Sequence, residues 1–146
     1  MARRRPGTDW TGLCRLIESS LCGEPGFGKN VQVAGRLQAN HDGFCHDNYF
    51  FTAGGQDLVL RLAKRFRPLR TRAESLKSLP REAETLRRLA DVRFSFAVPK
   101  LICTVANDAG VPVGLIESCL AGAPLSRFER EIKGRNQWTV PARSHR

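Results

Sequence analysis

The chain has 146 residues and a formal net charge of +10, with 24 Lys and Arg residues against 14 Asp and Glu. Hydrophobic residues make up 41% of it, which is enough for one small folded domain. No apolar run approaches the roughly 18 residues of a transmembrane helix and no signal peptide precedes the basic start, so we expect a cytoplasmic protein with no membrane partner.

The five cysteines argue against two kinds of site. Their number is odd, and no two of them have Cys-x-x-Cys spacing. His41 and His46 are also too isolated to form a set of metal ligands. We therefore expect neither a disulfide framework nor a metal bound by the protein alone.

The first predicted element is a helix from Thr8 to Leu21. Its apolar residues recur at helical spacing and form one stripe, made of Trp10, Leu13, Leu16 and Ile17. We assign residues 1–29 to a basic N-terminus followed by this helix.

A hairpin follows, with period-2 strands at Phe44 to Thr52 and Asp57 to Ala63. The segment between them contains Gly54 and Gly55. Paired glycines allow the positive φ angles of a tight hairpin turn, so the two strands should pair antiparallel.

Arg61 is the unusual residue of the second strand. Side chains alternate along a strand, so Arg61 points to the same side as Val59 and away from the leucines around it. A guanidinium on a mostly apolar face needs an anionic partner, either a carboxylate or a phosphate. The same pattern also fits an edge position at which the arginine reaches water.

A second helix is predicted to begin at Ser78, with Pro80 in its first turn. Its buried stripe should consist of Leu79, Ala83, Leu86 and Ala90. At about 100° per residue, Glu82 lies roughly 50° from the centre of this stripe, whereas Glu84 points nearly opposite, beside Arg88.

A second hairpin is predicted downstream. It has strands at Ile102 to Ala106 and Val111 to Ser118, with a turn at Asn107 to Gly110. The last strand then enters a Gly- and Pro-containing loop at 119–124.

Several motifs in this order resemble the aminoglycoside phosphotransferase and choline kinase-like family, which has a protein kinase-like fold. The resemblance covers about residues 30–128. It implies an α+β N-terminal lobe, with an antiparallel sheet of about five strands, one helix packed on it and an additional N-terminal helix. The motifs are Gly43-Phe44-Cys45-His46-Asp47-Asn48-Tyr49, Leu58-Val59-Leu60-Arg61, Arg81-Glu82-Ala83-Glu84-Thr85-Leu86, Gly114-Leu115-Ile116-Glu117 and Gly122-Ala123-Pro124-Leu125.

The resemblance implies that the lobe binds ATP with Mg²⁺. In the kinase fold a strand cation pairs with a helix carboxylate and contacts the α- and β-phosphates, a role that falls here on Arg61 and Glu82. Protein kinases carry lysine at the position of Arg61. Val59, on the same face, is also expected at the nucleotide. Without the resemblance, the preferred interpretation of Glu82 is an ordinary first-turn carboxylate favoured by the helix dipole.

Two further parts of the nucleotide site are implied by the resemblance. The phosphate-binding turn falls on the segment around Gly43, with Phe44, Cys45, His46 and Asn48. The adenine ring is expected at the hinge, where it would contact backbone groups of Glu117 and Cys119. A strand that ends in a Gly/Pro loop explains the hinge pattern equally well.

Phosphoryl transfer in this family needs aspartates in a catalytic loop beyond the hinge. No aspartate follows Asp108. Residues 129–146 form a basic tail without family motifs, which we expect to be disordered. The sequence therefore predicts a lobe truncated before the catalytic loop and inactive alone, with nucleotide and a separate C-terminal lobe chain or a second copy as partners.

The high net charge suggests an alternative function. Basic residues gather near both ends and in the connection between Arg61 and Lys77, but no aromatic stacking pattern accompanies them. We expect no specific nucleic-acid recognition. The alternative is a non-catalytic remnant whose basic surface binds a polyanion or a protein partner.

Overall fold

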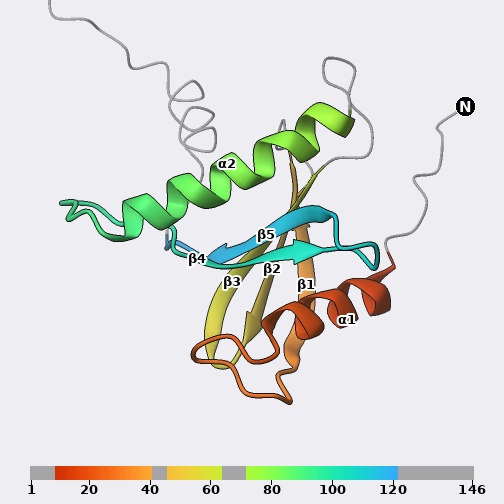
Figure 1. Cartoon of the computed structure of the whole chain (residues 1–146). Coiled ribbons are helices and arrows are strands. Elements are labelled where there is room, and N and C mark those ends of the chain that lie inside the picture. Colours follow the sequence, from red (N-terminus) through yellow and green to blue (C-terminus); the bar gives the residue numbers. More distant parts are fainter. Residues whose placement is uncertain (1–8, 41–45, 64–71, 122–146) are drawn as a thin grey trace, which may run out of the picture.

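The computed structural model describes residues 9–40, 46–63 and 72–121. The expected tail at 129–146 and the residues Gly43, Phe44 and Cys45 lie outside these ranges. In chain order the elements are α1 (Trp10–Leu21), β1 (Val33–Asn40), β2 (His46–Ala53), β3 (Gln56–Ala63), α2 (Arg72–Ala90), β4 (Leu101–Ala106) and β5 (Pro112–Ser118). The two helices and the sheet confirm the expected α+β architecture (Figure 1).

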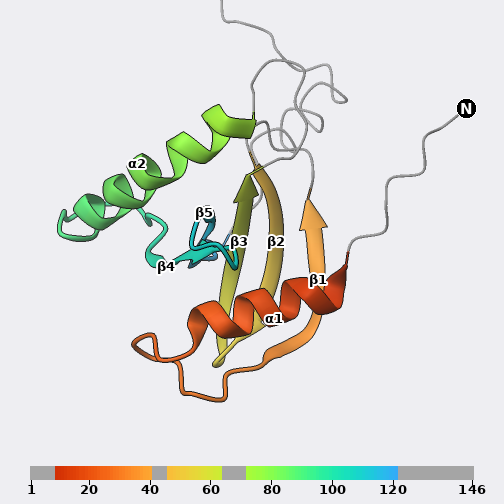
Figure 2. The ribbon, with the colours of Figure 1, turned by 45° about the vertical axis from the view of Figure 1, so that its right-hand side comes forward.

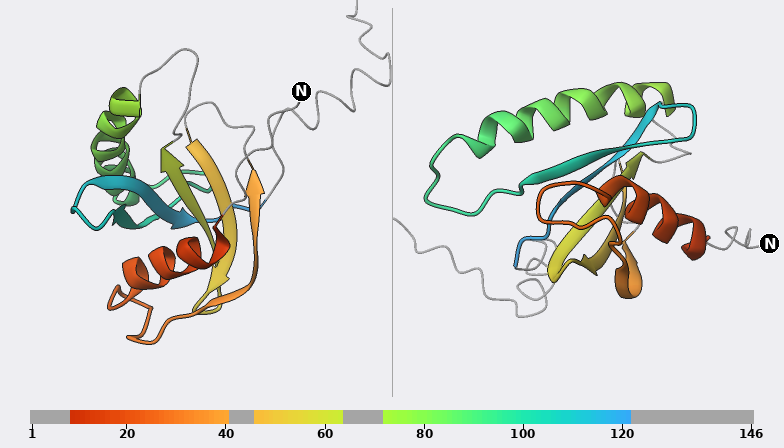
Figure 3. Two further views of the ribbon diagram at one scale, coloured as in Figure 1. Left: turned by 90° about the vertical axis from the view of Figure 1, so that its right-hand side faces the viewer. Right: turned by 60° about the horizontal axis from the view of Figure 1, so that its bottom comes forward.

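The five strands form one sheet in the order β1-β2-β3-β5-β4, and every neighbouring pair is antiparallel. The sheet is strongly twisted. In the left view of Figure 3, β5 crosses the direction of β2 and β3 at a wide angle. Such twist follows from the right-handed preference of each strand.

The turn between β2 and β3 sets the register of the central hairpin. Gly54 and Gly55 have φ angles of 56° and 71°, as the tight turn predicted for this hairpin requires. Pairing then runs without a bulge from Ala53↔Gln56 to His46↔Ala63. The hairpin is therefore built as its sequence predicts.

The two helices cover opposite faces of the sheet (Figures 1 and 2). On one face Ile17 and Leu21 of α1 enter the main core with Leu58 and Leu60 of β3, and none of these four side chains is exposed. On the other face α2 contacts β5, β4 and β3 through a smaller core. No helix within the described ranges is both long and apolar enough to cross a membrane.

The first helix begins at Trp10, two residues after the predicted start. Asp9 caps it, because its Oδ1 atom accepts a hydrogen bond of 3.0 Å from the backbone N–H of Gly12. An N-terminal N–H without an intrahelical partner is thereby satisfied.

The second helix corrects the predicted start. It begins at Arg72, six residues before Ser78, so Pro80 lies in its interior and not in its first turn. A proline there removes a single backbone hydrogen bond, and Leu76 continues the buried stripe beyond it. Leu79 and Ala83 are each 1% exposed as expected, but Ala90 at the C-terminal end is exposed.

Replacement of Leu60 by alanine tests the main core. The side chain is fully buried on the central strand, so Leu60→Ala should lower the free energy of unfolding by about 2–5 kcal/mol in urea denaturation. Val92→Ala is the control, because Val92 is 51% exposed and its truncation should cost less than about 0.5 kcal/mol. Similar losses in both variants would contradict the core described here.

The hairpin turn can be tested with two alanine substitutions. Gly55→Ala should cost about 1–2 kcal/mol of unfolding free energy through its positive φ alone, because nothing lies within 4 Å of the added Cβ atom. Gly54→Ala should cost more, because its Cβ would also lie 3.0 Å from the ring of buried Phe27. Equal costs in chemical denaturation would show that the Phe27 contact does not constrain the turn.

Candidate functional site

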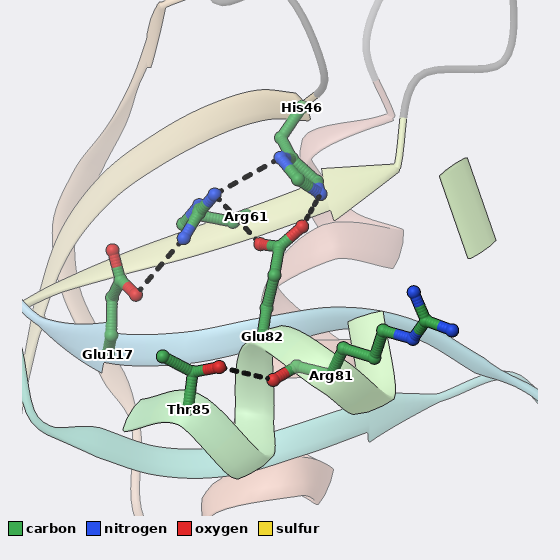
Figure 4. Close-up of polar contacts among 6 residues, drawn as sticks. All are labelled: His46, Arg61, Arg81, Glu82, Thr85 and Glu117. Carbon is green, nitrogen blue, oxygen red and sulfur yellow. Dashed lines mark hydrogen bonds and ion pairs between the residues drawn. The ribbon is translucent and has the colours of Figure 1, made fainter. Parts of the chain in front are cut away.

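The candidate site centres on Arg61, whose side chain is 28% exposed on the face of the sheet that α2 partly covers. Three side chains surround its guanidinium group (Figure 4). Nη2 donates to Oε2 of Glu82 at 3.0 Å and lies 3.2 Å from Nδ1 of His46, while Nη1 lies 3.4 Å from Oε2 of Glu117. Both terminal nitrogens therefore face a carboxylate.

Strand register brings three of these residues to one face. In the β2-β3 pair, Asn48 lies opposite Arg61 and His46 opposite Ala63. In the β3-β5 pair, Glu117 lies opposite Val59, which is two residues from Arg61. Residues that pair across strands, and those two apart along a strand, share a face of the sheet.

A close approach of backbones joins β5 to β3 beside Arg61. A Cβ atom on Gly114 would lie 2.6 Å from the carbonyl oxygen of Arg61 and 2.8 Å from Cδ2 of Leu62. Only glycine allows this spacing without a shift of one strand. The glycine thus lets β5 lie close to β3 beside Arg61.

Helix α2 supplies the remaining carboxylate. Leu79 and Ala83 are buried against Leu115, which fixes the rotation of the helix about its axis. Glu82 then points to Arg61, while Glu84 faces outward and pairs with Arg88 at 2.9 Å. The predicted Arg61–Glu82 contact is therefore present, although its role toward a nucleotide remains a prediction.

Glu117 takes part through its side chain, which the sequence did not suggest. The residue is 8% exposed, and burial raises the pKa of its carboxyl group. The charge and hydrogen bond of Arg61 act in the opposite direction, and the nearby charge of Glu82 adds to the rise. The alternation of β5, counted from its pairing with β3, is the signal that could have identified this contact.

His46 lies at the opposite side of the guanidinium group. Its ring is 4% exposed, with Nε2 3.7 Å from Oε1 of Glu82. Because arginine can only donate, Nδ1 accepts from Arg61 in the tautomer that carries its proton on Nε2. The ring therefore contacts Arg61 and Glu82 from a buried position, and the phosphate contact implied by the resemblance stays a prediction.

Asn48 is the other described residue of the predicted phosphate turn. It lies directly opposite Arg61, and its Oδ1 atom is buried without a hydrogen-bond partner in the described part of the chain. Buried amide groups usually have a partner, so this atom is available to a hydrogen-bond donor of a ligand.

A hollow of about 320 Å³ lies on the sheet near the end of β5. It is lined by Ala34, Gln38, Phe50, Phe51, Thr52, Asp57, Leu58 and Cys119. Phe50 lies opposite Val59 in the register and was not identified from the sequence. The backbone N–H of Cys119 donates to the carbonyl oxygen of Asp57 at 2.9 Å, so it is already engaged and its predicted contact with adenine remains untested.

The described side chains include a cation that can bind an anion, but they form no cluster of metal ligands. Among residues 9–40, 46–63 and 72–121 there is no group of three or more potential metal ligands. The thiol of Cys103 stays protonated, because burial and the charge of Glu24 raise its pKa to about 12. The available chemistry is the binding of an anion by a guanidinium group held in a fixed orientation.

The buried carboxyl group of Glu117 should make stability depend on pH. Its pKa is raised in the folded state, so its contribution is complete below the unfolded pKa and is lost as pH rises through the folded value. Replacement of Glu117 by Gln should remove this loss in thermal unfolding measured from pH 4 upward. Glu84→Gln, at a carboxylate 52% exposed, should show the same pH dependence of thermal unfolding as the wild type. The same dependence in Glu117→Gln would contradict a raised pKa of Glu117.

Comparison with known proteins supports the assignment of this lobe. The model of the phosphotransferase enzyme family matches residues 36–136, which is more than half of the chain. The comparison with curated proteins gives no match, and neither does the comparison with solved structures. On the family match, together with the strand cation and helix carboxylate of the described lobe, the chain belongs to the phosphotransferase enzyme family.

Proposed function

We propose that the chain binds a nucleotide, ATP with Mg²⁺, on the face of the sheet that carries Arg61. One observation carries the proposal: on β3, a strand that also lines a hollow of ligand size, a partly exposed guanidinium group is held in place by Glu82 and Glu117. A volume of about 320 Å³ lies within the usual range of small-ligand sites. The family membership supports the same ligand class.

The base and the phosphates would occupy different parts of this face. The hollow, with Phe50 and Cys119 in its lining, offers apolar contact for an aromatic ring. Arg61 lies two residues beyond Val59 along β3, and Val59 pairs with Phe50. A nucleotide with its base near Phe50 and Val59 would extend its phosphates toward Arg61, whereas the unpaired amide oxygen of Asn48 would accept a hydrogen bond from a donor group of the ligand.

Magnesium would enter with the nucleotide, because the described residues form no cluster of metal ligands of their own. Bound to the phosphates, the ion neutralises charge on the group to be transferred. The contribution of this chain is then to orient the phosphates through Arg61, which Glu82 and His46 hold from behind.

Phosphoryl transfer would require a second lobe. The role proposed for the described lobe is to bind the nucleotide in the cytoplasm, because the aspartates that transfer phosphate in this fold belong to a catalytic loop beyond the hinge. The rings of Phe94 and Phe96 are in contact, with centroids 5.1 Å apart and planes tilted by 35°, and the two residues are 38% and 66% exposed. Exposed aromatic rings suit a protein contact, which we assign to a separate catalytic lobe or to a second copy of the chain.

Thermal unfolding with Mg·ATP, compared with Mg²⁺ alone, tests nucleotide binding. Wild-type protein should unfold at a higher temperature with Mg·ATP, because ligand binding stabilises the native state. Arg61→Ala should weaken the affinity about tenfold to a hundredfold, since a hydrogen bond to a charged group is lost. Arg88→Ala is the matched control, because Arg88 is 79% exposed and pairs with Glu84 away from the site. Equal affinities of the two variants would remove Arg61 from the proposal.

The alternative function rests on the net charge of +10, which favours a polyanion. Under this alternative, affinity for an unrelated polyanion such as heparin should fall steeply from 50 to 200 mM salt and should not respond to ATP. Under the nucleotide proposal, ATP affinity should decrease in Arg61→Ala and remain in Arg88→Ala. Binding of heparin and of ATP, measured by fluorescence anisotropy at 50 and at 200 mM salt, separates the two functions.

A further inference from the structure

Arg61 has one more carboxylate than its anchoring requires. Glu82 faces Nη2 at 3.0 Å, and Glu117 faces Nη1 at 3.4 Å. Both ends of the guanidinium fork are therefore engaged by the protein itself. A phosphate that reaches Arg61 must share one of these ends or displace the carboxylate from it.

The two carboxylates are not equivalent. Glu82 makes the shorter contact and is also approached by the ring of His46, at 3.7 Å. Glu117 makes the longer contact from a more buried position, and burial raises the pKa of its carboxyl group despite the adjacent Arg61. Of the two carboxylates, ionised Glu117 is thus the weaker partner of Arg61. A ligand can therefore replace it at Nη1 of the guanidinium group.

Whether a phosphate can replace Glu117 at Nη1 depends on the charges around Arg61. With both carboxylates ionised, the group formed by Arg61, Glu82 and Glu117 has an excess of negative charge, which repels a polyphosphate. A proton on Glu117 removes the excess, and a divalent cation on the phosphates reduces the charge of the ligand. Either change relieves the repulsion without altering the fold.

We propose that Glu117 is a specificity-determining residue: an anionic phosphate takes over Nη1 of Arg61 only when Glu117 is protonated or when a divalent cation arrives with the phosphate. Glu117 therefore selects the magnesium-bound nucleotide over the free nucleotide. This inference rests on the proposed nucleotide function and identifies the form of nucleotide that the site accepts. When metal-free nucleotide binds, Glu117 takes one proton from the solvent.

The groups that face Glu117 within the described residues are few. Arg61 comes from β3 and Glu82 from α2, while His46 of β2 acts through its contact with Arg61. Its neighbours in the pairing with β4 and β3 are Leu101 and Val59, which do not titrate. The nucleotide phosphates also titrate near neutral pH, but their effect is common to all variants and cancels in a ratio of affinities.

The experiment measures ATP affinity by isothermal titration calorimetry at pH 5.5 and pH 8, with Mg²⁺ and with EDTA. The variants are Glu117→Gln and, as a matched control, Glu84→Gln on the exposed side of α2. At pH 8 without metal, Glu117→Gln should bind ATP about fivefold to tenfold more tightly than the wild type. The difference should shrink at pH 5.5 and with Mg²⁺, and Glu84→Gln should match the wild type throughout.

Proton uptake provides a second measurement on the unmodified chain, in case Glu117→Gln does not fold. Titrations of wild-type protein in buffers of different ionisation enthalpy should show more proton uptake with metal-free ATP than with Mg·ATP.

The outcomes distinguish the inference from the function on which it rests. If the wild type binds ATP but Glu117→Gln binds metal-free ATP equally or more weakly at pH 8, the selective role of Glu117 is overturned and the nucleotide site remains. Equal proton uptake with and without Mg²⁺ overturns it as well. If neither wild type nor Glu117→Gln binds ATP under any condition, the proposed function and this inference both fail.

Discussion

A guanidinium group that is partly buried on the face of a sheet loses hydration, which anionic partners must replace. Arg61 finds two such partners, Glu82 on α2 and Glu117 on β5, and it also contacts His46 on β2. The charge therefore adds a polar link between the sheet, whose strands β2, β3 and β5 are joined by backbone pairing, and α2, which otherwise packs on it through apolar side chains. A cation held from several sides cannot swing freely, so it presents a fixed orientation to a ligand.

Several features of the backbone determine which side chains contact Arg61. The glycine turn between β2 and β3 determines which residues of the two strands lie opposite each other, and Gly114 lets β5 approach β3 closely beside Arg61. The small core under α2, with Leu79 and Ala83 against Leu115, orients Glu82. Packing and electrostatics are therefore coupled: a shift of α2 would change the charge around Arg61 before it exposed the main core on the other face of the sheet, whereas a shift of β5 would disturb both, because Ile116 belongs to the main core.

Local rules predicted much of this arrangement. Two glycines between alternating strands were sufficient to predict the central hairpin, and helical periodicity separated Glu82 from Glu84 correctly. The start of α2 was predicted six residues too late, because a proline is typical of a first turn and the apolar stripe that continues through Leu76 was not taken into account. Tertiary packing compensated there for a locally unfavourable residue.

The sequence by itself determined the hairpins, the helical faces and the cation on an apolar strand, because these follow from periods of 2 and 3.6 residues and from glycine at tight turns. Only the tertiary structure decided that Glu117 would reach Arg61, that His46 would be buried behind it and that Phe50 would line a hollow beside Val59. Each of these contacts depends on strand pairing or burial between segments distant in the chain. A residue's face is a local property, whereas the partner that meets it is set by how the faces pack together.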